Sequence, residues 1–379
     1  MAPMLPPASE APGRLAEVLW SLADRVVQAQ APSSDIGLNK AVVVVVDGLG
    51  AHSLRQTRGH ARFLSRRWEE SGRDVSSGLP STTASSLASI TTGVEPGLHG
   101  LLGYQIRVPD QGVLLNHLKP YPPGVTPELW QSRQTVFDFA AQHAVSGIAV
   151  GESKFEHSDF TRSILRGARY LSSRSLQDHV AILRRFFDSV DRGIAYLYWP
   201  ALDRLGHQYG PGSTAWCDAL EELDSALAVL DRSLRPGEGG YLTADHGMVT
   251  VPHEDQIVFP EHHPLRREIA LWGGEPRLVQ LYLREPDQAS TVAQDLQDYL
   301  GERATVLLRE EALHRRLFGE VASNHRDRVG DVLVFAEGQV ALYDELTASA
   351  RSREMLGHHG SWSAEEVRVP LIPLGPAWV

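Results

Sequence analysis

"AVVVVVDGLG", residues 41–50, contains five consecutive valines that end at a carboxylate, Asp47. An unbroken apolar run of this kind is typical of a strand buried on both faces, as the strands of parallel sheets are. Gly48 and Gly50 follow, and glycine lets a backbone turn sharply. A single acid in this position is often only a helix cap or a turn residue. A functional interpretation of Asp47 therefore needs partners elsewhere in the chain.

Composition and charge narrow the class of protein. The 379 residues are 42% hydrophobic and 22% charged, which suits one large α/β domain or two smaller ones. The formal net charge of −11 disfavours nucleic acid and anionic membranes as partners. No apolar run approaches the ~20 residues that cross a bilayer. An acidic chain can still bind a small anionic substrate if metal ions hold that substrate.

The cysteine content and the first residues bear on location. Cys217 is the only cysteine, so an intramolecular disulfide and a CxxC metal site are excluded. Residues 1–12 are rich in Pro and Ala and lack the pattern of a signal peptide, so we expect a flexible tail there. Both observations favour a cytoplasmic location. The sequence does not fix the oligomeric state.

Strand and helix patterns alternate along the first two thirds of the chain. This alternation predicts an α/β fold with a doubly wound, mostly parallel sheet and helices on both faces. Helices are expected at residues 13–30, 61–72, 134–143, 175–190 and 215–234, and strands at 41–46, 146–151, 194–199 and 239–245.

The pattern changes after residue 252. Strands are predicted at residues 277–285, 303–310 and within 331–342, with a helix at 289–301. We interpret this region as a small α+β cap inserted into the main domain. The expected division is a tail at 1–12, a core at 13–255 and 340–379, and an inserted cap at 256–339.

Acids and histidines gather where the predicted strands end. In open α/β sheets the functional crevice lies outside the carboxyl ends of the strands. Each segment is weak evidence alone, because single aspartates and histidines usually have structural roles. Four segments together favour a shared site: "VVVVVD", "YLYWPALD" with a histidine four residues later, "YLTADH" and "GHHG" supply Asp47, Asp203, His207, Asp245, His246, His358 and His359.

Several carboxylates brought close together need a positive counter-charge to stay ionised. Divalent metal ions would supply that charge. Imidazole and carboxylate ligands without thiolate suit zinc first, and manganese or iron next. The sequence therefore predicts a metal centre with Asp47 as a ligand held by a buried strand.

The stretch "LPSTTASSLASITTG", residues 79–93, offers candidate oxygen nucleophiles and passes into a helical pattern. A hydroxyl at the start of that helix would lie beside free backbone N–H groups, which favour an anion. Runs of Ser and Thr also cap helices without any further role. The candidate hydroxyls are those of Ser81, Thr82, Thr83, Ser85 and Ser86.

The order of these motifs resembles the alkaline phosphatase superfamily, and most of all its nucleotide pyrophosphatase/phosphodiesterase branch. The resemblance runs from about residue 41 to residue 375, and "DRLGHQYGPGS" and "ADHGM" are its most specific parts. It implies two Zn²⁺ ions, with Mn²⁺ as an alternative. The implied ligands are Asp203, His207 and His359 for one ion, and Asp47, Thr83, Asp245 and His246 for the other.

The resemblance also implies roles for two hydroxyls. Thr83 is the third residue after Pro80, where the family carries its nucleophile, and His359 rather than His358 directly precedes a glycine, as in the family. The chain has "ASSL" after Thr83, so Ser86 stands where the family has an asparagine that binds a phosphate oxygen. This departure puts the substrate preference in question.

The function implied is a two-metal phosphodiesterase or nucleotide pyrophosphatase that forms a covalent phospho-threonine and acts on a small phosphoester or nucleotide. A phosphonate hydrolase and a phosphomonoesterase with the same site remain alternatives. The monoesterase would need an extra cation, and the nucleophile segment has no arginine. A mutase would need a basic cluster that is not evident. A metal-bound protein without catalytic activity is a further alternative.

Overall fold

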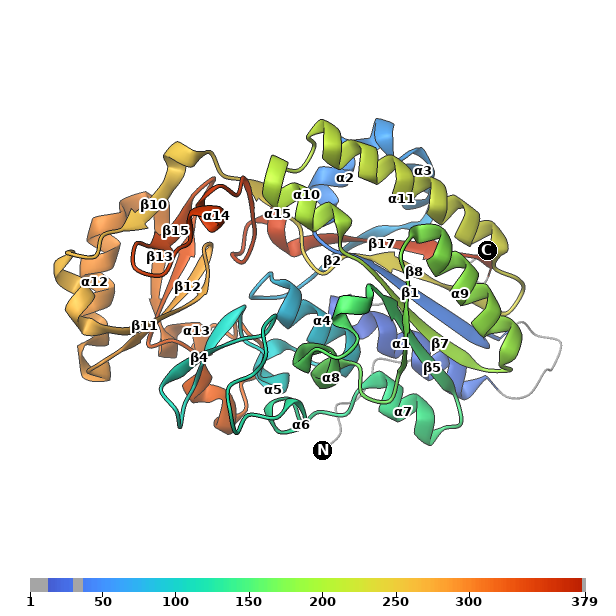
Figure 1. The fold of residues 1–379 in the computed structure, drawn as a ribbon, viewed down its shortest axis with the longest axis horizontal. Helices are drawn as coiled ribbons and strands as arrows, with labels where there is room; N and C mark the ends of the chain where they lie inside the picture. The colour runs from blue at the N-terminus through green and yellow to red at the C-terminus, as the bar shows by residue number, and fades with distance from the viewer. Residues whose placement is uncertain (1–12, 30–36, 377–379) are drawn as a thin grey trace.

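A computed structural model describes residues 13–29 and 37–376, and Figure 1 shows its fold. The largest sheet has seven strands in the order β2-β17-β8-β1-β7-β5-β6. All pairs among β8, β1, β7, β5 and β6 are parallel, and β17 is antiparallel to both of its neighbours. The strands are β1 (Lys40–Val46), β2 (Arg73–Ser76), β5 (Ser146–Gly151), β6 (Arg169–Ser172), β7 (Gly193–Trp199), β8 (Glu238–Thr243) and β17 (Arg368–Leu374).

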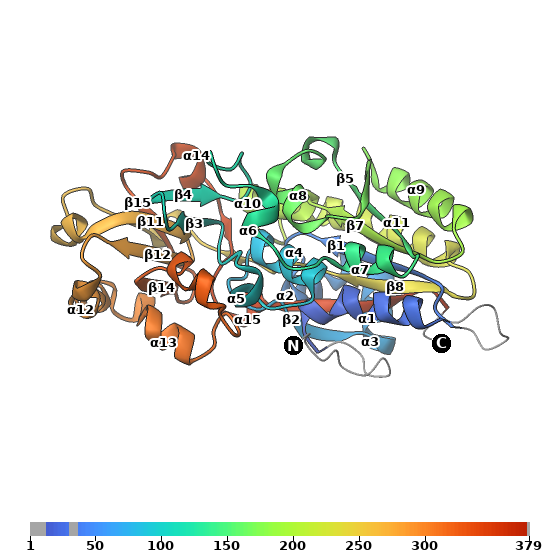
Figure 2. The ribbon, with the colours of Figure 1, turned by 90° about the horizontal axis from the view of Figure 1, so that it is seen from below.

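Helices cover both faces of this sheet (Figures 1 and 2). On one face α1 packs on β1 and α7 on β5, and α4 packs on α1. On the other face α2 and α3 pack on β17 and α9 on β7, while α11 lies against α3 and α9. The predicted doubly wound fold is therefore confirmed. These helices are α1 (Leu15–Gln28), α2 (Ala51–Gln56), α3 (Arg62–Ser71), α4 (Thr83–Thr92), α7 (Val136–Gln142), α9 (Leu176–Ser189) and α11 (Thr214–Ser233).

Strand β1 lies at the centre of the sheet. The side chains of residues 41–46 are all buried, because neighbouring strands flank β1 on both sides and helices cover it on both faces. This environment explains the unbroken valine run. Helix α1 shows the complementary pattern, with its apolar face buried against β1 and α4 and its polar face toward solvent. Of the region predicted to be helical, residue 30 lies outside the described residues.

A second, four-stranded antiparallel sheet has the order β11-β12-β14-β13 and lies beyond one end of the central sheet (Figure 1). Helix α12 packs on β13 and β14 and closes a separate apolar core. The elements are β11 (Ile269–Glu275), β12 (Leu278–Leu283), α12 (Ala289–Leu300), β13 (Ala304–Leu308), α13 (Arg309–His314) and β14 (Val332–Ala336).

The division into core and cap stays a prediction, and one strand pair bears on its boundary. Strand β15 (Ala341–Asp344) pairs in parallel with β10 (Gln256–Phe259), and Leu342 belongs to the apolar core of the second sheet. We therefore propose that the cap extends to Asp344 rather than to residue 339. The predicted tail at 1–12 lies outside the described residues.

Short elements complete the fold and surround the end of the central sheet. They are α5 (Pro96–His99), β3 (Gln105–Val108), β4 (Val113–Asn116), α6 (Pro127–Trp130), α8 (Asp159–Ile164), α10 (Ala201–Tyr209), β9 (Val249–Thr250), α14 (Ala350–Arg353), β16 (Gly357–His358) and α15 (Ala364–Val367). Within the described part of the chain, no helix combines the length and hydropathy that a membrane crossing requires.

Candidate active site

Strand register brings the predicted acids to one edge of the sheet. Val46 on β1 lies opposite Trp199 on β7, and Val45 lies opposite Thr243 on β8. Because the three strands are parallel and end together, the residues that follow them meet at the same edge. That edge faces the four-stranded sheet, with α4 and α10 beside it (Figure 1).

Asp203 reaches the site from a helix that follows the strand predicted at residues 194–199. Strand β7 ends at Trp199, and Pro200 precedes the first turn of α10. Proline has no backbone N–H to continue a sheet. Asp203 and His207 then lie one helical turn apart on the same face of α10, with Oδ1 and Nε2 separated by 3.3 Å.

Gly48 allows α10 to approach the turn after β1. Its φ is +74°, a conformation that favours glycine. A Cβ at this position would lie 3.0 Å from the Cα of Asp203 and 3.2 Å from its Cβ. The glycine predicted from the sequence as a turn residue therefore also makes room for a candidate ligand.

Two groups of side chains have the spacing of a metal centre. In each group the candidate ligand atoms all lie within 4.8 Å of one another. His359 Nε2 is 3.9 Å from Asp203 Oδ1, and His246 Nε2 is 3.4 Å from Asp47 Oδ1. The first group is Asp203, His207 and His359, and the second is Asp47, Asp203 and His246.

Asp245 lies beside the second group. Its Oδ2 is 3.6 Å from His246 Nε2, and its Oδ1 accepts hydrogen bonds from the backbone N–H groups of Gly48 and His246 at 3.1 and 3.0 Å. These bonds orient the carboxylate so that Oδ2 faces the imidazole. The geometry therefore brings together all six Asp and His residues that the sequence singled out as ligands.

The three candidate histidine ligands all contact a backbone carbonyl through Nδ1. The Nδ1 atoms of His207, His246 and His359 contact the carbonyl oxygens of Gly357, Gly247 and Ser81 at 2.7, 3.1 and 2.9 Å. Because a carbonyl oxygen can only accept, each Nδ1 donates to its carbonyl, and the Nε2 atom of the same ring lies on the side of the carboxylates. Metal-binding histidines usually have this kind of second hydrogen bond.

His358 has a different environment. Its Nε2 contacts the hydroxyl of Tyr343 at 2.6 Å, and its Nδ1 contacts the carbonyl of Leu356 at 3.1 Å. Both ring nitrogens are therefore engaged away from the two groups. The choice of His359 over His358 agrees with this geometry, and metal binding by His359 stays a prediction.

The carboxylates lack partners on the atoms that face the centre. Asp47 Oδ1, Asp203 Oδ1 and Asp245 Oδ2 are buried and accept no hydrogen bond. Burial, with the charges of Asp203 and Asp245, raises the pKa of Asp47 well above its usual value. Burial, with nearby His246 and His207, lowers the pKa of His359 well below its usual value. Unpartnered carboxylate oxygens beside imidazole nitrogens fit divalent cations.

Thr83 lies beside the second group. It is the first residue of α4, and its Oγ1 is 3.1 Å from His246 Nε2. The backbone N–H groups of a first helical turn have no acceptor within the helix, so they favour an anion at this point. Ser86 is one turn further along, with a fully buried hydroxyl that has no hydrogen-bond partner. Ser86 is not among the residues that line the neighbouring cavity.

That cavity has a volume of about 260 Å³ and opens beside Thr83, Asp47 and Asp203. Its walls are mainly aliphatic and aromatic. The two cations at its rim, Lys154 and Arg204, both pair with Glu152, at 2.6 and 2.8 Å. The apolar lining residues are Leu87, Leu118, Val150, Phe155, Phe160, Ile164, Leu165, Tyr170, Tyr196, Tyr198 and Pro200.

Sequence reasoning missed Tyr198, which contacts the site, and it considered Ser81 only as a candidate nucleophile. The Tyr198 hydroxyl donates a hydrogen bond to Asp47 Oδ2. Ser81 accepts from His359 through its carbonyl, and its hydroxyl donates to the carbonyl of Ser361 at 2.6 Å. The alternation in β7 could have indicated Tyr198, because it directs Tyr196 and Tyr198 to the same face of a strand that leads to the site.

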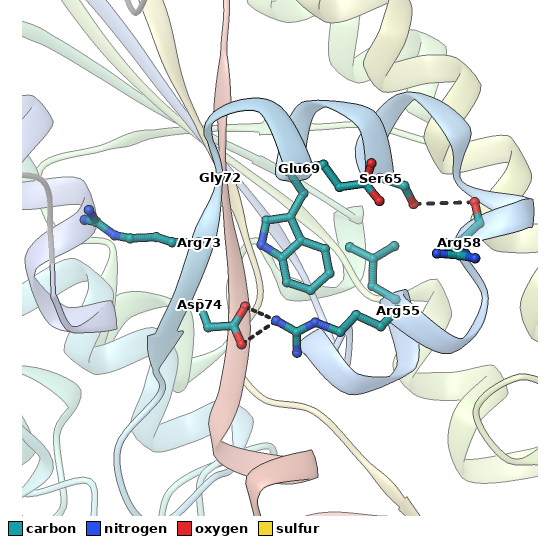
Figure 3. Close-up of a pocket in the computed structure, with 9 residues that line it drawn as sticks. Arg55, Arg58, Ser65, Glu69, Gly72, Arg73 and Asp74 are labelled. Carbon is teal, nitrogen blue, oxygen red and sulfur yellow. Dashed lines mark hydrogen bonds and ion pairs between the residues drawn. The ribbon is translucent and has the colours of Figure 1, made fainter.

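A second depression, of about 510 Å³, lies between α2, α3 and β2 (Figure 3). Arg55 forms two hydrogen bonds to Asp74, at 2.8 and 2.7 Å, and its guanidinium lies over the Trp68 ring. None of the predicted site residues lines this depression. We therefore assign the candidate chemistry to the edge of the central sheet.

Comparison with known proteins agrees with this arrangement. The sequence model of the type I phosphodiesterase / nucleotide pyrophosphatase family matches residues 41–362, from the start of the valine strand to just beyond His359. The chain belongs to this family. The type I phosphodiesterases are phosphoester hydrolases of the alkaline phosphatase superfamily, and metal dependence is typical of them. The predicted family and enzyme class are thus confirmed.

Solved structures share the fold of this phosphodiesterase family member. Murine ectonucleotide pyrophosphatase/phosphodiesterase 5 has a TM-score of 0.68 at 18% identity, over 89% of this chain and 88% of that one. Phosphonoacetate hydrolase from Sinorhizobium meliloti 1021, in complex with phosphonoformate, has a TM-score of 0.66 at 21% identity, over 89% of this chain and 91% of the hydrolase. At these identities the likeness concerns the fold.

A shorter match occurs with phosphopentomutase from Anaeromyxobacter sp. (strain K). It is 45% identical over 91 residues, which span 23% of this chain and only 22% of the mutase. The match therefore concerns a fragment of both proteins.

Proposed function

We propose that this type I phosphodiesterase family member hydrolyses phosphodiesters with Thr83 as the nucleophile. One observation carries the proposal: the Thr83 hydroxyl lies 3.1 Å from His246 Nε2, at the start of α4 and beside the second group of candidate ligands. A nucleophile needs an adjacent group that activates it.

Two Zn²⁺ ions, or Mn²⁺ in their place, fit the unpartnered carboxylate oxygens and the Nε2 atoms that lie beside them. We propose Asp203, His207 and His359 as ligands of one ion, and Asp47, Thr83, Asp245 and His246 as ligands of the other. When bound, such ions favour the alkoxide of a coordinated hydroxyl and neutralise charge on phosphoryl and leaving oxygens. Because Asp203 belongs to both geometric groups, it is also a candidate to contact both ions.

The residues of the chain would act in two displacements. Thr83 Oγ1 forms a bond to phosphorus, and the bond to the first alcohol breaks. Water then attacks the phospho-threonine, which releases the second ester as a phosphomonoester and restores the hydroxyl. The backbone N–H groups at the start of α4 stabilise the equatorial oxygens. Tyr198 holds Asp47 in place through its hydrogen bond.

A diester is favoured over a monoester because of the charges at the cavity. A monoester carries one more negative charge, which calls for an additional unpaired cation. Lys154 and Arg204 are the cations among the lining residues, and Glu152 pairs with both. The apolar walls suit the ester group of a diester or of a nucleotide.

Substitution of the nucleophile gives a direct test. In zinc-loaded protein, Thr83→Ala should lose at least about 10³-fold in kcat on an aryl phosphodiester, since it removes the attacking atom. Zinc content, measured by atomic emission, should stay near the wild-type value. Thr83→Ser, which keeps a hydroxyl, should retain part of the activity. Full activity in Thr83→Ala would contradict the proposal.

The role of Ser86 can be separated from that of Thr83. If its hydroxyl donates to a phosphoryl oxygen in the transition state, Ser86→Ala should lower kcat by about 10²-fold. An unchanged kcat would assign Ser86 to packing within α4.

Parallel assays with the aryl monoester and with phosphonoacetate test the alternative functions, a phosphomonoesterase and a phosphonate hydrolase. Preference for either substrate, or zinc binding without turnover of any, would overturn the phosphodiesterase proposal.

A further inference from the structure

Three residues that line the cavity carry a buried polar atom without a hydrogen-bond partner: Asp47, Asp203 and Tyr196. The two carboxylates face the candidate metal centre. The hydroxyl of Tyr196 is different, because phenol is a poor metal ligand when it keeps its proton. The side chain is only 2% exposed, so bulk water does not satisfy this hydroxyl. A buried donor without an acceptor is costly, which indicates a partner that the protein alone does not supply.

We propose that the Tyr196 hydroxyl donates a hydrogen bond to an acceptor atom on the ester group that enters the cavity, and so selects substrates by that atom. This inference rests on the proposed phosphodiesterase function and adds the chemical class of the bound group. The group is flat and largely apolar, with one oxygen or nitrogen acceptor on it.

The placement of Tyr196 supports this role. Tyr196 and Tyr198 are two residues apart on β7, and their rings are stacked, with centroids 6.5 Å apart and planes 9° apart. The Tyr198 hydroxyl already donates a hydrogen bond to Asp47. The neighbouring Tyr170 hydroxyl donates to the carbonyl of Glu152 at 2.9 Å. Of the three phenols in the cavity wall, Tyr196 alone has a hydroxyl without a partner among the described residues.

The protonation of Tyr196 agrees with a donor. Burial raises its pKa well above the usual value, and the charges of Asp245 and Asp47 act in the same direction. The phenol therefore stays protonated over the neutral range. The rest of the wall is mainly aliphatic and aromatic and includes Phe155, Phe160 and Leu87, a lining that suits a flat ring.

The test compares ligands that differ by one acceptor atom. Phenylphosphonate and its 2-, 3- and 4-pyridyl analogues carry the same phosphonate and differ only in a ring nitrogen. Each is titrated calorimetrically into zinc-loaded protein, at a pH where the ring nitrogen is unprotonated. We expect at least one pyridyl isomer to bind wild type about 5-fold more tightly than phenylphosphonate. Tyr196→Phe should abolish that preference and leave phenylphosphonate affinity nearly unchanged.

Tyr170→Phe is the matched control, because its hydroxyl already has a protein acceptor, and it should keep the pyridyl preference. Tyr196→Phe should also fold at least as stably as wild type, since it removes an unsatisfied buried group. An equal preference in wild type and Tyr196→Phe would overturn the inference, as would failure of all four ligands to bind. Calorimetry needs no turnover, so an inactive but selective protein would overturn only the phosphodiesterase proposal.

Discussion

At the residue scale, Glu275 is a carboxyl group enclosed beside the site. It packs against Gly360, where any Cβ would overlap its side chain, and Gly360 directly follows His359. Its Oε2 accepts from the backbone N–H of Tyr104 at 2.8 Å, while its Oε1 has no partner. Burial raises the pKa of Glu275 to about 8, and the charge of Glu366 adds to the shift. Folded protein therefore keeps this carboxyl neutral near pH 7.

This raised pKa predicts a pH-dependent stability. Because the folded pKa exceeds the unfolded one, the free energy of unfolding falls as pH rises from the unfolded value of about 4.3 through about 8. Glu275→Gln should remove this dependence, and so should be more stable than wild type above the folded pKa. Urea unfolding of wild type and Glu275→Gln, at pH values below and above the folded pKa, measures the difference between their free energies of unfolding. The exposed substitution Glu302→Gln should leave the slope unchanged, and a wild-type slope in Glu275→Gln would contradict the prediction.

At the element scale, the turn after β1 decides how closely α10 approaches the valine strand. The sequence predicted the strand and the turn, because a buried apolar run and a glycine are local signals. It did not predict that Asp203 lies in the first turn of α10, since only the packing of α10 against Gly48 brings that carboxylate to the edge of the sheet.

Gly48→Ala tests how much the close approach of α10 adds to the cost of backbone strain at this position. Alanine at φ +74° costs about 1–2 kcal/mol in the left-handed region, and its Cβ would press on Asp203. We expect a total loss of about 2–4 kcal/mol and weaker zinc binding. The control is Gly78→Ala, with φ +84° and no atom within 4 Å of the new Cβ. It should show only the backbone cost. Denaturant unfolding and a zinc titration compare the two variants, and equal losses would exclude a contribution from the approach of α10.

At the scale of the whole molecule, a buried ion pair joins the four-stranded sheet to the segment that carries His359. Arg277 and Glu366 are both fully buried, with two hydrogen bonds of 2.9 Å between them. Glu366 also accepts from the backbone N–H of Ser361 at 2.8 Å. Ser361 in turn accepts from the Ser81 hydroxyl, and the Ser81 carbonyl orients His359. The second sheet therefore supports the candidate active site through this chain of contacts.

Removing one partner of this pair should be costly. Arg277→Met leaves Glu366 buried without a counter-charge, and we expect a loss of about 3–5 kcal/mol in the free energy of unfolding, together with weaker zinc binding. The double variant Arg277→Met/Glu366→Gln should recover part of the stability. Arg162→Met breaks an exposed pair with Glu128 and should cost less than about 1 kcal/mol. Equal effects of Arg277→Met and Arg162→Met in denaturant unfolding would refute the structural role.

The sequence by itself determined the features that depend on neighbouring residues. The hydrophobic period separated strand from helix, the valine run marked a central parallel strand, and the residue types at the strand ends indicated metal chemistry. The tertiary structure alone decided which of these atoms meet. His359 contacts Ser81 across 278 positions of the chain, Asp203 joins both ligand groups, and Tyr196 is left with an unpartnered hydroxyl in the cavity wall. Such relations arise from packing between distant segments, whereas periodicity and turn propensity report only on local conformation.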